Sequence, residues 1–256
     1  MVHAFIAGTC IAIAAPLIGS FLLIRRYSIF ADTLGHVSFL SVAIAVLLGI
    51  NPIGVSIVGA LIAATILEKL RATKRVNSEN SLALFLSGSL ALGVVLLSFA
   101  KTTSVNISSI LFGSITTIAS SDMYIIIIVT LLASLVALFN FPSFFLIAFD
   151  EEYARVKGIR VTLLNYVLML TAALVISVSI TVIGILLIGA LMVIPVITAY
   201  QFKKGFKTSV GLAIAFSLVE VWLGLITSFY WNLPAGSSIV LIALIFFLIA
   251  GIFRKK

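Results

Sequence analysis

The sequence has very few charged side chains. Only 9% of its 256 residues are Asp, Glu, Lys or Arg, whereas 62% are hydrophobic, and the mean hydropathy is +1.34. Soluble globular domains have roughly 25% charged residues. The composition therefore excludes an ordinary soluble domain. Its long apolar runs predict an all-α, polytopic integral membrane protein.

Thiols and histidines are also scarce. Cys10 is the one cysteine, so no intrachain disulfide and no thiolate metal cluster are possible. The chain has two histidines, His3 and His36, and no His-Glu-x-x-His motif, which argues against an intramembrane metalloprotease. It also has no glycine-rich phosphate loop of the Walker type, so we expect no ATPase site and no catalytic residues of its own.

The net charge of +8 does not indicate a nucleic-acid partner, because the basic residues are distributed as in a membrane protein. Fifteen of the 16 Lys and Arg residues fall in five clusters between apolar runs, and only Lys101 stands apart. The clusters are Arg25 and Arg26; Lys69, Arg71, Lys74 and Arg75; Arg155, Lys157 and Arg160; Lys203, Lys204 and Lys207; and Arg254, Lys255 and Lys256. The positive-inside rule predicts that these clusters are cytoplasmic. The partner that surrounds the chain is membrane lipid.

The apolar runs predict eight or nine transmembrane helices, with the N-terminus outside and the C-terminus in the cytoplasm. Spans are expected at about 2–24, 28–50, 52–67, 81–100, 123–139, 163–180, 209–229 and 239–253. The count depends on Val182–Ala199, which we interpret as a shorter seventh helix that Gly184, Gly189 and Pro195 could break. It also depends on Asn106–Ser121, which is polar and is expected to be an outer or re-entrant piece.

Asp32 and His36 are the best clue to function. They stand four residues apart, so both side chains lie on one face of the second helix. Ionisable residues within a membrane helix are costly and usually serve a function. A carboxylate with an imidazole is a suitable ligand pair for a divalent transition metal. The alternative is a structural pair that ties two helices together.

Glu220 is a second ionisable residue within a predicted span. It could be a proton or metal relay, or a buried acid that is hydrogen-bonded to Ser or Thr. The sequence favours the second interpretation.

Several segments closely resemble the permease subunits of bacterial zinc and manganese ABC importers. The matching segments follow the family order along nearly the whole chain: Pro16–Phe21, Arg25–Ser28, Asp32–His36, Leu111–Ser114, Phe149–Ala154 with Gly158, Ile183–Leu187, Ile194–Pro195, Thr198–Ala199 and Leu233–Leu241. The chain departs from the pattern at Ser78–Leu84, where an aspartate and a glycine are often found, and at Asn232, where some members carry aspartate. Glu220 is not part of the pattern.

The resemblance implies an ABC-importer permease fold in which residues 1–256 form one transmembrane domain. It implies a homodimer, two copies of an ABC ATPase subunit in the cytoplasm and an extracytoplasmic metal-binding protein. The two-fold axis would bring Asp32 and His36 of both copies to one central pathway, where four ligands would hold a metal ion in transit. No permanently bound cofactor is expected, and the cargo is a zinc or manganese ion.

The resemblance also implies a cytoplasmic coupling segment at about 140–161 that docks on the ATPase, with Asp150, Glu151, Ala154 and Gly158 as its key residues. Asp150 is placed to cap the start of a short helix, and Gly158 lies where that helix would end. Ala154 is small enough to lie against a partner surface.

Zinc is preferred over manganese as the cargo, because the Asp-Thr-Leu-x-His form and the Pro-Ala-Gly turn at 234–236 are closer to the zinc branch, and histidine suits zinc slightly better. The alternative function is an ion-gradient-driven secondary metal transporter, in which Asp32, His36 and Glu220 would relay protons. A requirement for ATP would distinguish the two functions. In either case, the expected location is the cell (inner) membrane.

Overall fold

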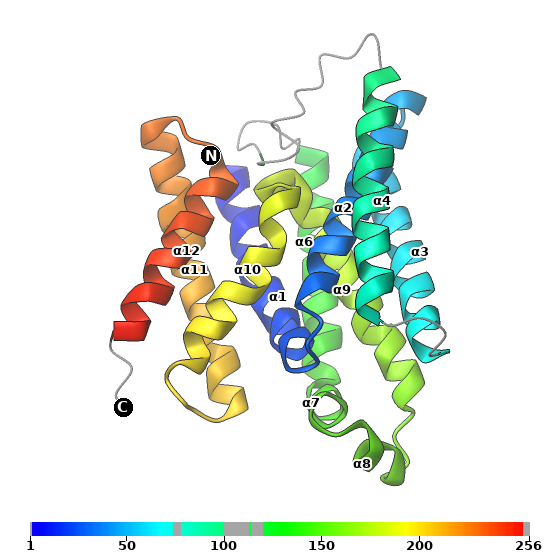
Figure 1. Ribbon diagram of the computed structural model, residues 1–256. Helices are drawn as coiled ribbons and strands as arrows, with labels where there is room; N and C mark the ends of the chain where they lie inside the picture. The colour runs from blue at the N-terminus through cyan, green and yellow to red at the C-terminus, as the bar shows by residue number, and fades with distance from the viewer. Residues whose placement is uncertain (1, 74–77, 100–112, 114–119, 253–256) are drawn as a thin grey trace.

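The computed structural model describes residues 2–73, 78–99, 113 and 120–252, and within these ranges the regular structure is entirely α-helical (Figure 1). The long helices are α1 (Val2–Ile24), α2 (Ser28–Leu48), α3 (Pro52–Ala72), α4 (Ser78–Phe99), α6 (Ser120–Phe139), α9 (Val161–Ile183), α11 (Phe206–Trp231) and α12 (Ala235–Ile252). The shorter ones are α7 (Phe141–Phe149), α8 (Glu151–Val156) and α10 (Ile185–Tyr200).

Eight helices of the described chain are long and apolar enough to cross a membrane. This confirms the expected polytopic, all-α class. Helix α10 is also apolar but is shorter than these eight helices. Its 16 residues extend about 24 Å at about 1.5 Å per residue, which is less than a hydrocarbon core of about 30 Å. Within the described residues, the choice between eight and nine spans therefore depends on whether α10 is counted.

Local sequence explains where α2 ends and α3 begins. Gly49 follows α2 in the left-handed conformation, with φ of 65°. Asn51 then caps α3, because its side chain accepts hydrogen bonds from the backbone N–H groups of Ile53 and Gly54. Pro52 occupies the first helical position, where a missing N–H costs nothing. The predicted turn at Asn51 and Pro52 is confirmed.

The boundary between α9 and α10 differs from the prediction. The break falls at Gly184, where φ is 90° and ψ is 162°, a conformation that favours glycine. Gly189 and Pro195 lie inside a continuous α10, so they do not break the helix as expected. Compared with the predicted Val182–Ala199 helix, α10 therefore begins three residues later and ends one residue later.

Residues 141–149, at the start of the predicted coupling segment, form a helix of their own. This helix, α7, is rich in phenylalanine and lies at the lower end of the bundle in Figure 1. Phe141 and Phe144 of α7 pack edge-on against the buried Phe21 of α1, with ring centroids 5.2 and 5.6 Å apart. Phe145 also packs against Phe206 at the start of α11. This aromatic cluster holds α7 against the long helices.

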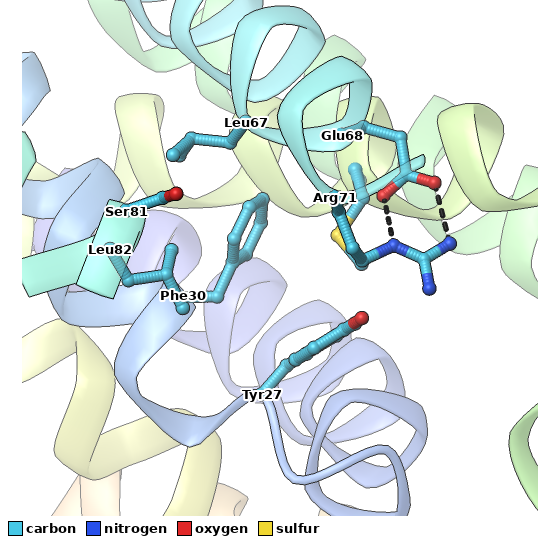
Figure 2. Close-up of a pocket in the computed structure, with 8 residues that line it drawn as sticks. Tyr27, Phe30, Leu67, Glu68, Arg71, Ser81 and Leu82 are labelled. Carbon is cyan, nitrogen blue, oxygen red and sulfur yellow. Dashed lines mark hydrogen bonds and ion pairs between the residues drawn. The ribbon is translucent and has the colours of Figure 1, made fainter. Parts of the chain in front are cut away.

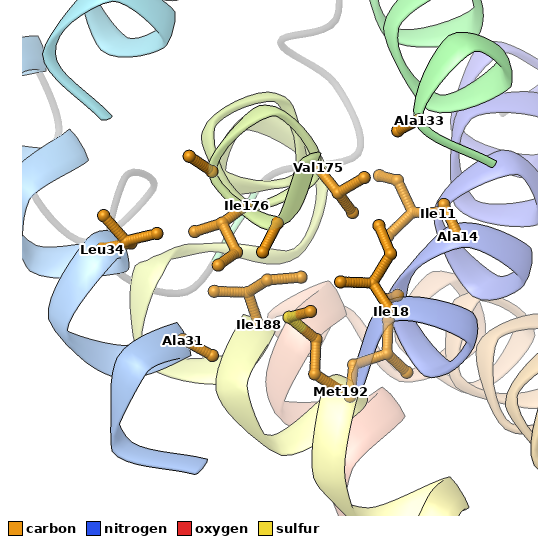
Figure 3. Close-up of a cluster of buried hydrophobic side chains, with 14 of the residues drawn as sticks. Ile11, Ala14, Ile18, Ala31, Leu34, Ala133, Val175, Ile176, Ile188 and Met192 are labelled. Carbon is orange, nitrogen blue, oxygen red and sulfur yellow. The ribbon is translucent and has the colours of Figure 1, made fainter. Parts of the chain in front are cut away.

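The main hydrophobic core lies where α1, α2, α9 and α10 meet. Figure 3 shows Ile18, Leu34, Ile176 and Ile188 converging from these four helices. By contrast, α4 and α6 bury little of their surface within the chain. The inner helices are thus fixed by their own chain, whereas the outer ones are left to contact lipid or another subunit.

The basic clusters of the described chain gather at one end of the bundle. The turn between α1 and α2, the end of α3, the α7–α8 segment and the turn between α10 and α11 all lie at the lower end in Figure 1. This is the arrangement that the positive-inside interpretation needs. The predicted outer segment Asn106–Ser121 falls mainly outside the described residues, apart from Gly113 and the start of α6.

Candidate metal site and coupling segment

Asp32 and His36 lie on α2, one turn apart, as predicted. His36 is buried at 9% exposure, and its Nδ1 atom has no hydrogen-bond partner in the described chain. Asp32 is exposed on the surface of the isolated chain. A charged residue of a membrane helix normally faces a cavity or a partner. The pair therefore has free ligand atoms on a helix that is otherwise well packed.

Helix α10 makes room for the Asp32 carboxylate. A Cβ added at Gly189 would overlap Oδ1 of Asp32. The carboxylate thus lies directly against the α10 backbone at a residue without a side chain. One turn along α2, Gly35 lies against Ile185 at the start of the same helix. Sequence reasoning named Gly189 as a possible break in the helix and did not identify Asp32 as its neighbour.

The described part of one chain does not complete a metal site. It contains no group of three or more His, Cys, Asp or Glu side chains that could hold a metal ion. Asp32 and His36 offer two ligands, and transition metals in proteins usually take four or more. A complete coordination shell would need ligands from another source.

The predicted short helix at the coupling segment is present as α8. Asp150 caps it by accepting a 2.9 Å hydrogen bond from the backbone N–H of Tyr153. Gly158 follows the helix with φ of 78°, a conformation that glycine adopts easily. Asp150 therefore caps the start of α8 and Gly158 follows its end, as the sequence predicted.

Ala154 lies elsewhere than expected. It is completely buried against Ile147 of α7 and Val161 of α9, so it faces its own chain and not a partner surface. The helix that was expected to present Ala154 instead presents Tyr153 and Val156. Val156 is 86% exposed, and Phe149 at the end of α7 is exposed nearby. Sequence reasoning missed these apolar residues, because periodicity over six residues cannot say which side of a helix is covered.

Glu151 also points partly inward. Its carboxylate accepts hydrogen bonds from Arg25 at 3.1 Å and Arg155 at 2.9 Å, and it lies 3.7 Å from Arg71. Partial burial raises the pKa of Glu151, but the Arg155 hydrogen bond and the nearby arginines outweigh this effect, so its pKa lies below the ordinary value. The side chain is therefore ionised at neutral pH.

Glu220 is fully buried within α11. Neither of its carboxyl oxygens has a hydrogen-bond partner in the described chain, and the same holds for the Ser217 hydroxyl on the preceding turn. The hydrogen bond to Ser or Thr that the structural interpretation assumed is therefore not formed. A buried polar group without a partner destabilises a fold, so Glu220 requires another explanation.

Comparison with known proteins gives relatives over almost the whole chain. The model of the ABC 3 transport family matches residues 1–254. The chain is 34% identical to the "Manganese transport system membrane protein MntC" of Listeria monocytogenes, over 99% of this chain and 90% of the relative. It is 32% identical to the "High-affinity zinc uptake system membrane protein ZnuB" of Buchnera aphidicola, over 97% of this chain and 95% of the relative.

A solved structure has the same architecture. The chain aligns with "PsaBC from Streptococcus pneumoniae in complex with Fab" at a TM-score of 0.86 and 32% identity. The alignment covers 97% of this chain and 90% of the other.

Proposed function

Because the chain belongs to the ABC 3 transport family, we propose that it is the membrane-spanning permease subunit of an ABC importer that carries a divalent metal ion into the cytoplasm. The observation that carries the proposal is the pairing of Asp32 and His36 on α2, where the Asp32 carboxylate lies against Gly189 of α10 and the Nδ1 atom of His36 has no hydrogen-bond partner in the described chain. The named relatives transport manganese or take up zinc, and both kinds match nearly the full chain.

Zinc is the proposed cargo, with manganese next. The support is the histidine beside the carboxylate, because imidazole suits zinc somewhat better than it suits manganese. The identities to the manganese and zinc relatives, 34% and 32%, are too similar to favour either metal.

The proposed pathway lies between two copies of the chain. One chain offers a pair of ligands, and Asp32 is exposed on it. A two-fold axis beside α2 would add a second pair, giving two carboxylates and two imidazoles around one ion. An extracytoplasmic metal-binding protein would deliver the ion. In this proposal residues 1–256 act as one permease domain, and the chain has no ATPase site of its own.

The proposed ATPase contact is the α7–α8 segment. Three large side chains of this segment, Phe149, Tyr153 and Val156, are exposed, and the segment lies at the end of the bundle that carries the basic clusters. Exposed apolar surface outside the membrane commonly marks a protein interface. Two ATPase copies, one for each permease, would bind there. The positive-inside rule places this end in the cytoplasm and the N-terminus outside the inner membrane.

The test is metal uptake by the purified importer. The chain would be co-expressed with a candidate partner ABC ATPase, reconstituted in proteoliposomes and supplied with the metal-loaded binding protein. We expect uptake of radioactive zinc that requires ATP and is competed by manganese. Uptake driven by a proton or sodium gradient without ATP would instead support the secondary transporter.

A further inference from the structure

Glu151 lies at the centre of a set of ion pairs that joins α8 to other parts of the fold. Its arginine partners come from three places: Arg25 follows α1, Arg71 lies in the last turn of α3, and Arg155 belongs to α8 itself. The three pairs differ in burial. The Arg155 side chain is 64% exposed, whereas those of Arg25 and Arg71 are only 6% and 20% exposed. Shielded pairs are weakened less by salt and water than exposed ones, so the links to α1 and α3 are screened less than the Arg155 pair.

The partners of Glu151 are themselves held in place. Arg25 also donates a hydrogen bond to the side-chain oxygen of Asn165 on α9. Arg71 donates two hydrogen bonds to the buried Glu68, at 2.8 and 2.7 Å, as Figure 2 shows. A two-point contact of this kind fixes the orientation of the Arg71 guanidinium group, and Arg25 is held by its single bond to Asn165. Both arginines are therefore held in place beside Glu151.

The same arginines contact the residue that precedes α2. The guanidinium carbons of Arg25 and Arg71 lie 5.5 and 5.7 Å from the centre of the Tyr27 ring. Tyr27 stands directly before α2, the helix that carries Asp32 and His36. Glu151 is thus connected through two arginines to the start of the candidate metal helix.

A small cavity lies at this junction. Tyr27, Phe30, Glu68, Arg71 and Leu82 are among its lining residues, and its volume is about 20 Å³, room for about one water molecule (Figure 2). The cavity lies between the start of α2, the end of α3 and the start of α4, beside Arg71.

Helix α8 has few other attachments. It is six residues long and packs against α7 and α9 through Ala154. The carboxylate of Glu151 is its direct link to the ends of α1 and α3.

We propose that Glu151 is a positioning residue that transmits the position of α8 to the ends of α1 and α3, and through Tyr27 to the start of the helix that carries Asp32 and His36. The inference rests on the proposed function, in which α8 contacts the ATPase. Glu151 faces the interior of the permease, whereas Tyr153 and Val156 of the proposed ATPase contact are exposed on α8. The inference therefore adds to the coupling step a residue that does not itself contact the ATPase.

The first part of the test uses the full permease alone in nanodiscs, without ATPase or metal, so it does not depend on the proposed function. Hydrogen–deuterium exchange would be compared in Glu151→Gln and in the matched control Glu152→Gln. Glu152 is the exposed neighbouring acid, and it makes none of these ion pairs. We expect exchange at residues 24–28 and 151–156 to be at least fivefold faster in Glu151→Gln and unchanged in Glu152→Gln. Equal exchange in the two variants would overturn the proposal.

The second part uses the reconstituted importer and measures metal transported per ATP hydrolysed. We expect Glu151→Gln to lower this ratio at least fivefold while ATP hydrolysis stays within twofold of the parent. Arg26→Gln, which removes the exposed arginine next to Arg25 and none of these ion pairs, should leave the ratio unchanged. A parallel fall in hydrolysis and transport would assign Glu151 to the ATPase contact itself and would overturn the proposal.

Glu151→Asp keeps the negative charge but has a shorter side chain. If the Glu151→Gln protein does not reach the membrane, both measurements would be made on Glu151→Asp. It should lower the transport ratio at least twofold, and an unchanged ratio would overturn the proposal. A failure of ATPase binding in every variant, including the parent, would contradict the proposed function while leaving the exchange result intact.

Discussion

The carboxylate of Asp32 occupies the space that a side chain at position 189 would need. The finding joins two residues 157 positions apart and explains why α10 has a glycine there. It also gives the candidate metal ligand a fixed neighbour on a second helix. If α10 moves during transport, the movement would directly displace the Asp32 carboxylate, because the two are in contact.

Gly189→Ala should lower metal uptake at least tenfold. The added methyl would displace the Asp32 carboxylate, and a misplacement of about 1 Å in a functional group can cost roughly 100-fold in rate. The matched control is Gly211→Ala in α11, where a Cβ meets nothing within 4 Å. Initial rates of radioactive zinc and manganese uptake would be measured at equal protein levels. Equal rates in both variants would show that the contact does not matter for transport.

His36→Ala and Asp32→Ala should each abolish uptake while the protein still reaches the membrane. Each change removes one of the two ligand groups and leaves the other without its partner ion. His3→Ala, which removes the chain's other histidine, should transport normally. Uptake and membrane quantity would be measured together. A well-expressed His36→Ala protein with normal uptake would contradict the ligand role and support the interpretation of the pair as structural.

Val156→Asp should prevent the ATPase from copurifying, because Val156 is the most exposed apolar residue of α8 and a charge would oppose its burial. Ala154→Trp should act differently. Ala154 is buried in its own chain, so a large ring there would displace α8 and lower the thermal stability of the permease, by typically 1–3 kcal/mol for an overpacked site. Pull-down and melting measurements distinguish the two. A stable Ala154→Trp permease that fails to bind the ATPase would instead indicate that Ala154 contacts the ATPase.

Single cysteines placed in a Cys10→Ser background should report the orientation. Lys157, Lys204 and Asn232 are all exposed in the structure. In intact cells, a membrane-impermeant thiol reagent should label position 232 and spare positions 157 and 204, because the positive-inside rule places the basic loops in the cytoplasm. All three should react after the membrane is opened. Labelling of position 157 from outside would reverse the orientation and remove the proposed ATPase contact.

Glu220→Gln should slow uptake at least tenfold without lowering the melting temperature. The carboxylate has no partner in the described chain, so its replacement by an amide of the same shape removes no stabilising bond. An amide cannot release a proton, so a proton relay through position 220 would be interrupted. Ser217→Ala, which removes the neighbouring unpartnered hydroxyl, should transport normally. Normal uptake by Glu220→Gln would exclude the relay, and a markedly lower melting temperature would indicate a structural bond that forms with another subunit.

The sequence by itself determined the class of the protein and most helix positions. A composition with 9% charge and long apolar runs leaves a helical membrane protein as the stable outcome, because backbone groups in lipid must bond within their own segment. The turn at Asn51 and Pro52 and the cap at Asp150 were also predictable, since they depend on residues next to each other in the chain. The spacing of Asp32 and His36 likewise placed both on one face of α2.

Only the tertiary structure decided which surfaces meet. The contact of Asp32 with Gly189, the burial of Ala154 and the arginines around Glu151 all join residues from different helices. Apolar periodicity could not predict them, because a membrane helix can be apolar on every side and so does not mark its inner face. The same limit explains the break at Gly184. A glycine can serve either as a packing point or as a break, and the neighbouring helices decide which.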